Sequence, residues 1–204
     1  MGRIVKAKVM QSKRTVALAR WLLGKHLVRR MPDGAVVARL ITEVEAYHGE
    51  SDLACHARAG RTRRTEPLYG PGGRWYVYLC YGIHEMLNLV AGPPDWPAAI
   101  LIRGVEGIVG PGRLTHQLAI GRTLNGLAAE ETTGLWIEDR GVNVPRSLVK
   151  ATARIGVDYA GEIWANKPWR FTFDPAQLPK KRAKKKTSAH EHAKSIRSPQ
   201  GRAS

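Results

Sequence analysis

The feature that most constrains the fold is a run rich in Val, Ile and Leu from Ala35 to Tyr47, directly after the turn signal Met31-Pro32-Asp33-Gly34. This composition predicts one long strand or two consecutive strands. Because strands and short helices occur without a βαβ rhythm, the chain is expected to be α+β. Further strands are predicted over 75–80, 83–90, 98–105 and 169–173, a short hairpin over 138–144, and helices over 16–27, with Thr15 as the N-cap, and 113–120.

The charge of the chain is far from balanced. Its net charge is +16 at 204 residues, and its isoelectric point is about 10.4. Nine of the 33 Lys and Arg residues and one of the 17 acids lie in residues 180–204, which leaves +8 on the first 179. A surplus of this size indicates a polyanionic partner, either nucleic acid or an acidic membrane surface. Residues 180–204 have almost no large apolar side chains, so we expect a disordered tail after a folded domain at 1–179.

Several protein classes are disfavoured by the sequence. Two cysteines, Cys55 and Cys80, are too few for a secreted disulfide framework, and no signal peptide or membrane-spanning run is visible, so we expect a soluble intracellular protein without a membrane partner. The spacing of His48, Cys55 and His56 matches no zinc motif, and the motifs of zinc deaminases and phosphate loops are absent. Neither a metal nor a cofactor is therefore predicted.

Two carboxylates in the long apolar run are candidates for chemistry. Glu43, Glu45 and Tyr47 alternate along a strand and so share one face, while Val44 and Ala46 point the other way. A carboxylate beside an aromatic ring in a partly dry pocket has the properties of a general base, and we assign this role to Glu45. Glu43 is expected to belong to a solvent-facing side of the strand.

Tyrosines and arginines form a second candidate group. Tyr76 and Tyr78 share a strand face and Tyr81 follows them, which is compatible with a core of hydrogen-bonded tyrosines or with a binding surface. Residues 48–73, predicted to be a long surface loop, favour the second interpretation because they are rich in arginine. Aromatic rings among basic residues are suited to holding an unstacked base. The arginines in or next to this loop are Arg58, Arg61, Arg63, Arg64 and Arg74.

Taken together, these segments resemble the alkyladenine DNA glycosylases, also called methylpurine or 3-methyladenine DNA glycosylases, from about Ala17 to Phe173. One departure is Thr65, which follows Arg64 where the family usually has asparagine. The motifs that carry the resemblance are Glu43-Val44-Glu45-Ala46-Tyr47, Tyr76-Val77-Tyr78-Leu79-Cys80-Tyr81-Gly82, Asn88, Leu101-Ile102-Arg103, Gly110-Pro111-Gly112-Arg113-Leu114 and Arg154-Ile155-Gly156-Val157.

The resemblance implies a single α+β domain around a curved antiparallel β-sheet with peripheral helices. It also implies a role for each matching residue. Glu45 corresponds to the general base, Arg103 to a residue near the attacking water and the phosphate, and the Ile155 carbonyl to a further ligand of that water. Tyr47, His56 and Tyr78 correspond to the cage around a flipped base, and Asn88 to a side chain that disfavours guanine. Tyr81 corresponds to the wedge that fills the gap in the DNA, and Leu101 to a DNA contact.

The implied activity is that of a monofunctional DNA glycosylase of base excision repair, which hydrolyses the N-glycosidic bond of flipped alkylated or deaminated purines with an activated water. The expected partner is double-stranded DNA containing damaged purines, and the protein is expected to be a monomer at the bacterial nucleoid in the cytoplasm, or in the nucleus of a eukaryote. Two alternatives remain open at this point. The same basic, aromatic surface would suit a non-enzymatic nucleic-acid-binding protein, or an RNA-binding or ribosome-associated module.

Overall fold

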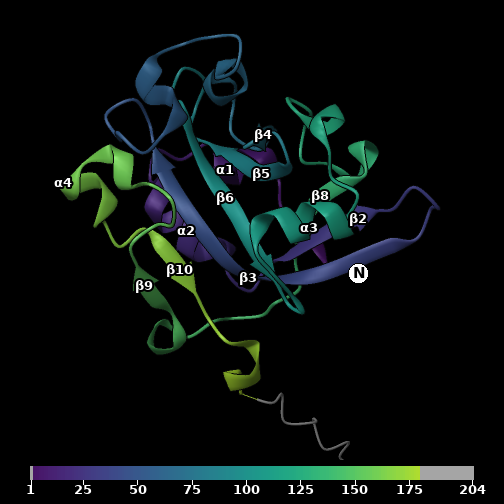
Figure 1. Ribbon diagram of the computed structural model, residues 1–204. Coiled ribbons are helices and arrows are strands. Elements are labelled where there is room, and N and C mark those ends of the chain that lie inside the picture. Colours follow the sequence, from purple (N-terminus) through teal and green to yellow (C-terminus); the bar gives the residue numbers. More distant parts are fainter. Residues whose placement is uncertain (1, 180–204) are drawn as a thin grey trace, which may run out of the picture.

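The computed structural model describes residues 2–179, and the predicted disordered tail at 180–204 lies outside the described residues. Within them, ten strands form one antiparallel sheet (Figure 1). The strands are β1 (Arg3–Ile4), β2 (His26–Arg30), β3 (Val36–His48), β4 (Trp75–Cys80), β5 (His84–Ala91), β6 (Ala98–Val105), β7 (Ile108–Val109), β8 (Leu135–Asp139), β9 (Lys150–Thr152) and β10 (Arg170–Thr172).

Between residues 2 and 179, four short α-helices accompany this sheet. The sheet is open, with the order β1-β8-β2-β3-β6-β5-β4, and β10 and β9 branch from β3. An antiparallel sheet with peripheral helices confirms the predicted α+β domain. The helices are α1 (Ala7–Met10), α2 (Thr15–Leu22), α3 (Pro111–Gln117) and α4 (Glu162–Ala165).

The predicted long run is a single strand, β3, and it connects the two halves of the sheet. Its first five residues pair with β2, while the segment from Ile41 to His48 pairs with β6 and residues 43–45 also pair with β10 on the other side. Val44 and Ala46 are fully buried in the main core, as their alternation with the two glutamates predicted. The second half of β3 therefore has neighbours on both edges, which fixes the position of its side chains.

The core of the described residues consists of one large cluster, a second, smaller one, and a third made of Ala54, Val157 and Ala160. In the large cluster, α2 packs on β3 and β6, and α3 packs on β5 and β6. The smaller cluster includes Ala57 and Leu68, which belong to the segment at 48–73, and Tyr76 of β4. This segment arches over the top of the molecule in Figure 1 and contains two 3₁₀ helices, His56–Ala59 and Glu66–Tyr69. Its prediction as a surface loop was thus wrong for these buried positions.

Two helix predictions need correction. α2 ends at Leu22 rather than Leu27, because Leu23 is extended and Gly24 adopts a left-handed φ of +81° before β2 begins. Thr15 is not the N-cap but the first helical residue, and its hydroxyl lies 3.1 Å from Nδ1 of His48. α3 covers 111–117 and not 113–120, since Pro111 suits the first turn of a helix.

The hairpin predicted over 138–144 was also wrong. Residues 135–139 form β8, and its partners are β2 and β1, which lie more than 100 residues away in the sequence. Residues 140–149 return as an irregular segment with one short 3₁₀ turn. Pairing over such a distance leaves no local signal for sequence-based prediction.

One close approach of backbone segments gives a test of this fold. Gly72 donates its N–H to the carbonyl of Gly92, and a Cβ at Gly72 would overlap the Met10 carbonyl group and lie 2.9 Å from the Gly92 oxygen. Because backbone cannot yield as a flexible side chain can, Gly72→Ala is expected to lower the free energy of unfolding by about 1–3 kcal/mol in urea denaturation.

Gly121→Ala is the matched control for this substitution. Gly121 has a φ of −129°, and the space that an alanine methyl group would occupy there is open, so alanine fits without strain. We expect its free energy of unfolding to equal or slightly exceed that of the parent. Equal stability of the two variants would contradict the tight packing of 72 against 10 and 92.

Candidate active site

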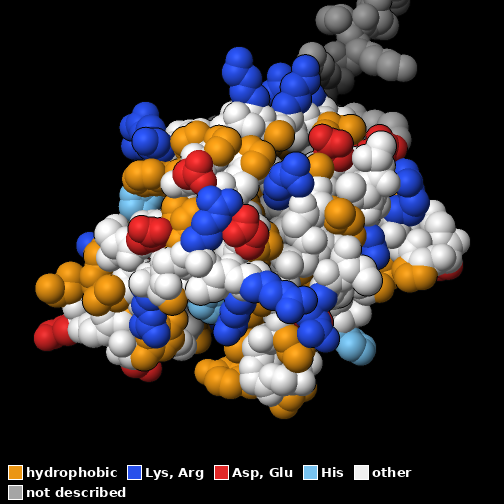
Figure 2. Space-filling model, turned by 90° about the horizontal axis from the view of Figure 1, so that it is seen from above, with side chains coloured by type: hydrophobic (Ala, Val, Ile, Leu, Met, Phe, Trp, Pro, Cys, Tyr) orange, Lys and Arg blue, Asp and Glu red, His pale blue; other side chains and the backbone are white. Residues whose placement is uncertain are grey.

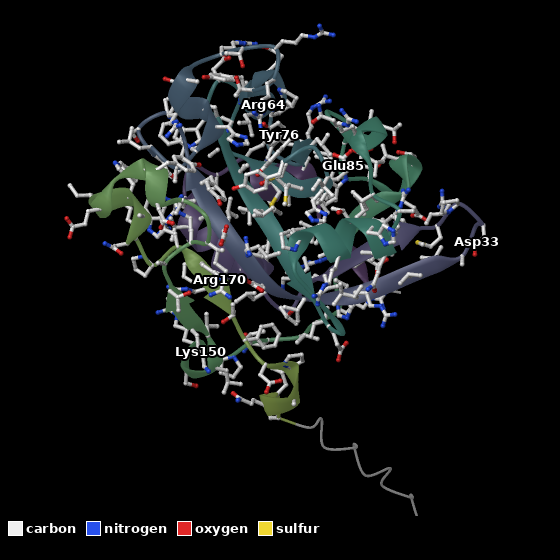
Figure 3. All side chains as sticks on the ribbon, in the orientation of Figure 1. Asp33, Arg64, Tyr76, Glu85, Lys150 and Arg170 are labelled. Atoms are coloured by element: carbon white, nitrogen blue, oxygen red, sulfur yellow. The ribbon has the colours of Figure 1, made fainter. Side chains whose placement is uncertain are left out.

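A cavity of about 590 Å³ opens at the end of β3 and β6, between the 48–73 segment, the β4–β5 hairpin and the segment around Ile155. In Figure 3, Arg64 and Tyr76 lie on the upper side of this region, and Arg170 lies on β10 on the opposite side. Eight of the nine sequence-predicted site residues line the cavity: Tyr47, His56, Tyr78, Tyr81, Asn88, Leu101, Arg103 and Ile155.

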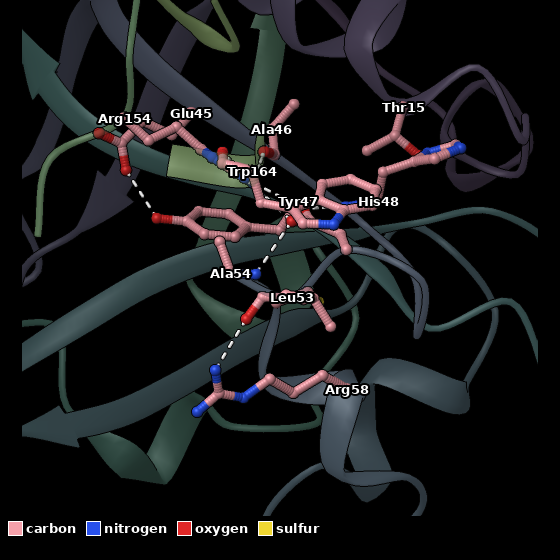
Figure 4. A network of polar contacts seen from close by, with 12 residues as sticks. Thr15, Glu45, Ala46, Tyr47, His48, Leu53, Ala54, Arg58, Arg154 and Trp164 are labelled. Atoms are coloured by element: carbon pink, nitrogen blue, oxygen red, sulfur yellow. Dashed lines mark hydrogen bonds and ion pairs between the residues drawn. The ribbon is translucent and has the colours of Figure 1, made fainter. Parts of the chain in front are cut away.

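The ninth, Glu45, lies directly behind this lining and is 0% exposed. Its Oε1 accepts a hydrogen bond from the backbone N–H of Ile155 (2.9 Å), and its Oε2 accepts one from the Tyr47 hydroxyl (2.8 Å). Figure 4 shows the Tyr47 ring lying along the strand with its hydroxyl at the Glu45 carboxylate. The Nε of Arg103 is 3.4 Å from Oε1 and supplies an opposite charge.

Opposing effects act on the Glu45 carboxyl. Burial raises its pKa, since an ion is poorly solvated there, while the Arg103 charge and the hydrogen bonds from Ile155 and Tyr47 lower it. The net result is a pKa above that of an ordinary glutamate. A buried carboxylate with raised basicity and several donors has the chemical character of a general base.

Glu43 is not solvent-facing, so this prediction was wrong. It is 8% exposed, and its Oε1 accepts hydrogen bonds from Nε of Arg103 (3.0 Å) and Nε of Arg170 (2.6 Å). The cause is that β6 and β10 both flank β3 here, so that arginines from two neighbouring strands converge on one carboxylate. The sequence does not show which strands are adjacent.

A buried ion pair fixes the segment that contacts Glu45. Arg154 donates two hydrogen bonds to Asp52, at 2.6 and 2.9 Å, and both side chains are fully buried. Arg154 also donates to the carbonyl groups of Ala46 and Trp164, and its guanidinium lies 4.9 Å from the Tyr47 ring centre. Sequence reasoning missed Asp52, because a lone aspartate in a polar loop gives no sign of a partner 102 residues away.

Three aromatic rings form another wall of the cavity. His56 lies 4.5 Å from the Tyr78 ring centre, and its Nδ1 is 2.9 Å from the Tyr76 hydroxyl. Burial lowers the pKa of His56 to about 4, assisted by the charges of Arg64 and Arg58. The imidazole is therefore neutral at physiological pH, although arginines surround it. Tyr76, which was recognised as part of an aromatic group but not as a site residue, orients this ring.

The remaining lining residues are held firmly. The Asn88 amide donates to the carbonyl oxygens of Tyr76 (3.1 Å) and Met86 (3.3 Å), so its side chain has little freedom. Leu101 is buried and pairs with Glu45 across β3 and β6, which places it in the cavity wall rather than on the outer surface. Tyr159, not identified from the sequence, also lines the cavity, and its hydroxyl donates to the Ala54 carbonyl.

Tyr81 occupies the tip of the β4–β5 hairpin and is 87% exposed. Tyr81 and Gly82 both have positive φ, 51° and 71°. Tight hairpins with positive φ at both central positions normally carry asparagine, aspartate or glycine first, because larger side chains are disfavoured in this region. A bulky aromatic side chain thus projects into solvent from a backbone conformation that disfavours it.

The loop over the cavity is fixed by Thr65. The Thr65 hydroxyl accepts a hydrogen bond from the N–H of Thr62 (2.8 Å) and donates to the Gly60 carbonyl (2.9 Å). Of the loop arginines, Arg61 is paired with Glu66 and Asp95. Figure 2 shows Lys and Arg side chains spread over one face among hydrophobic side chains and a few carboxylates.

Two further findings concern the described residues only. No group of three or more His, Cys, Asp or Glu side chains is arranged there to hold a metal ion. None of the helices between residues 2 and 179 has the length and apolar character needed to cross a membrane.

Comparison with known proteins gives one consistent result. The family model described as methylpurine-DNA glycosylase matches residues 9–109 and 107–177. Relatives named "Putative 3-methyladenine DNA glycosylase" occur in Psychrobacter cryohalolentis (41% identity, covering 76% of this chain and 89% of the relative), Methanocella arvoryzae (44%, covering 77% and 86%) and Anaeromyxobacter dehalogenans strain 2CP-C (47%, covering 77% of each).

The ion pair between Asp52 and Arg154 leads to a stability prediction. Asp52→Asn keeps the shape but leaves the Arg154 charge buried without a counter-charge, a change that typically costs about 3–5 kcal/mol. We expect a loss of this size in the free energy of unfolding, measured in urea. The control is Glu66→Gln, which breaks the exposed pair with Arg61 and should leave stability nearly unchanged. Equal effects of the two substitutions would contradict the structural role of Asp52.

Proposed function

This chain belongs to the methylpurine-DNA glycosylase family, and from this premise we propose that its cavity receives a damaged purine flipped from double-stranded DNA and that Glu45 activates the water that releases the base. The membership makes the protein a DNA glycosylase of base excision repair that acts on alkylated purines. One observation carries the proposed mechanism: a fully buried carboxylate with raised pKa lies directly behind the wall of an aromatic cavity, hydrogen-bonded to the lining residues Tyr47 and Ile155.

The cavity fits the binding of a planar, positively charged base. A purine inside a duplex is shielded, so it must be extruded before its glycosidic bond can be reached. Tyr47 and Tyr78 offer ring faces, which attract a cation such as a ring-alkylated purine. His56, neutral at physiological pH, adds no repelling charge and can offer Nε2 to the base, because its Nδ1 is engaged by Tyr76. Asn88, fixed by two carbonyl groups, is proposed to disfavour guanine at the same wall.

The hydrolysis itself is assigned to Glu45, Arg103 and Ile155. Each oxygen of the Glu45 carboxylate accepts one hydrogen bond in the structure and has a second lone pair for a water proton. The Ile155 carbonyl and the Arg103 guanidinium are proposed to orient that water and the target phosphate. As the bond to an alkylated base breaks, positive charge develops on the sugar, and a buried carboxylate nearby stabilises it.

A single hydrolytic step, without a lyase step, is part of the proposal. A lyase step needs an amine that forms a Schiff base with the sugar, usually a lysine. Within the described residues, the cavity lining includes no lysine. Water is therefore the proposed nucleophile, and the enzyme is proposed to be monofunctional.

The partner and location follow from this substrate. The substrate is DNA. We propose that it is double-stranded DNA containing damaged purines and that the enzyme acts as a monomer. Tyr81 at an exposed turn is suited to fill the gap that a flipped nucleotide leaves in a duplex, with Leu101 contacting the nucleotide from the cavity wall. One chain provides every residue assigned here. The enzyme would work at the chromosome, which is the nucleoid of a bacterium or the nucleus of a eukaryote.

The two alternatives from the sequence make no use of the buried carboxylate. A non-enzymatic DNA-binding protein or an RNA-binding module needs a basic aromatic surface but no ionisable group behind a cavity. Family membership favours the enzyme over both. Substitution of Glu45 distinguishes the mechanisms directly.

We predict that Glu45→Gln slows the release of methylated purines from duplex DNA by at least about 10²–10⁴-fold under single-turnover conditions, the usual contribution of a general base. The amide keeps the shape of the side chain but cannot take a proton from water. Binding of the variant to damaged duplex should persist. Because burial raises the pKa of Glu45, the rate of the parent enzyme should decrease as the pH is lowered. This decrease should begin at a pH above the ordinary pKa range of glutamate.

Glu106→Gln, in the exposed turn between β6 and β7, is the matched control and should retain the parent rate. Parent-like release by Glu45→Gln would remove Glu45 from the mechanism. A parent protein that releases no base from any methylated duplex would contradict the proposed function itself.

A second prediction concerns Tyr81. Tyr81→Ala is expected to weaken binding to a duplex with an abasic-site analogue by about 1–3 kcal/mol, the scale of one lost base–aromatic stack. Fluorescence anisotropy at fixed salt measures this affinity. Tyr81→Phe retains the ring and should bind as the parent does. If alanine binds equally well, the ring does not enter the duplex.

A further inference from the structure

One guanidinium N–H lies between two carboxylates at the base of the cavity. Nε of Arg103 is 3.0 Å from Oε1 of Glu43 and 3.4 Å from Oε1 of Glu45. Only the contact with Glu43 has the geometry of a hydrogen bond. Within residues 2–179, neither Nη group of Arg103 forms a hydrogen bond, and the side chain borders the cavity. Glu43 therefore binds the N–H that would otherwise be available to Glu45.

The position of Glu43 is fixed from three sides. Arg170 on β10 donates its own Nε–H to the same Oε1 at 2.6 Å, and Nη1 of Arg170 is held by the Thr152 hydroxyl at 3.2 Å. The pairing of β3 with β6 shifts register at Glu43, next to Gly104. A Cβ at Gly104 would lie 3.3 Å from the Cβ of Glu43, so glycine provides the room for this carboxylate. The fold thus provides a defined place for a second buried acid.

We propose that Glu43 is a positioning residue, which holds Arg103 beside Glu45 as a charge but prevents a direct hydrogen-bonded ion pair between the two. This inference rests on the proposed role of Glu45 as general base. Glu45 already accepts hydrogen bonds from Ile155 and Tyr47. A third, charge-assisted bond from Arg103 would occupy a lone pair needed for the water proton and would weaken the base. Held on Glu43 through Nε, Arg103 at the border of the cavity keeps its Nη groups available for substrate and water.

The charges around Glu45 balance when all are ionised. Glu43 and the Tyr47 hydroxyl lie on the same strand as Glu45. Arg103 on β6 lies between the two carboxylates, and Arg170 on β10 is paired with Glu43. In the segment that contains Ile155, the neighbouring Arg154 is neutralised by Asp52. Two carboxylates thus face two guanidinium groups. Loss of Glu43 leaves one positive charge in excess near Glu45, and loss of Arg170 leaves one negative charge in excess.

These excess charges predict opposite shifts. In Glu43→Gln the freed Arg103 should stabilise ionised Glu45 and lower its pKa, by roughly one unit or more, the scale of an adjacent opposite charge. In Arg170→Gln the pKa of Glu45 should rise. The double variant restores the balance of charge, so its pKa should lie between the two. Glu43→Asp keeps the charge and should remain closer to the parent than Glu43→Gln does.

The experiment is a ¹³C NMR titration of the Glu45 carboxyl carbon in the free protein, assigned by its absence in Glu45→Gln. Single-turnover release from methylated duplex is measured in parallel over pH. We expect Glu43→Gln to be slower than the parent but faster than Glu45→Gln. The acid limb of its pH profile should move down, whereas that of Arg170→Gln should move up.

Shifts in the same direction, or no shift in either variant, would overturn the positioning role, even if both variants lose activity through altered structure. If Glu43→Gln does not fold, the upward shift in Arg170→Gln and the parent-like titration of Glu43→Asp decide the question alone. The titration requires no DNA, so it separates this inference from the proposed function. A parent enzyme inactive on methylated DNA would refute the function, whereas absent shifts in an active enzyme would refute only the role of Glu43.

Discussion

The structure depends on keeping a carboxylate ionisable inside a β-sheet. A charge without water is costly unless other groups replace its solvation, and such replacement requires several donors in fixed positions. Glu45 obtains hydrogen bonds from Tyr47, two residues away, and from the backbone of Ile155, 110 residues further on, and an opposite charge from Arg103 on the next strand. Each of these groups must itself be held. The pairing of β3 with β6 holds the arginine, and the buried pair of Asp52 with Arg154 holds the segment of Ile155.

The same constraint explains the layout of β3. Val44 and Ala46 anchor one face of the strand in the core, which directs Glu43, Glu45 and Tyr47 to the other face. That face is covered by the 48–73 segment and the residues around Ile155, so that Tyr47 lines the cavity and Glu45 lies directly behind the lining in place of a wet surface. Packing on one side thereby provides a rigid base for polar groups on the other. A site on a central strand with neighbours at both edges can be more precise than one on a mobile loop.

Local patterns in the sequence were enough to predict the strands that carry the site, namely β3, β4 and β6, and the alternation that brings Glu45 next to Tyr47. The resemblance to the family then identified eight residues that line one cavity in the structure. What remained hidden depends on contacts between distant segments. Neither the convergence of Arg103 and Arg170 on Glu43 nor the pairing of Asp52 with Arg154 has a local signature, since each requires the strand order. For the same reason β8 was mistaken for part of a hairpin.

The charges around the cavity bear on the binding of the proposed cationic base. The protein is strongly basic, as a DNA-binding surface requires, but a positive charge inside the cavity would repel an alkylated purine. Burial, assisted by the charges of the arginines nearby, lowers the pKa of His56 to about 4, so the imidazole is neutral at physiological pH. The Arg154 charge behind Tyr47 is cancelled by Asp52, and those of Arg103 and Arg170 by the two glutamates. The cavity thus presents the neutral rings of Tyr47, His56 and Tyr78 beside two arginines, Arg64 and Arg103, with the Glu45 carboxylate directly behind the lining.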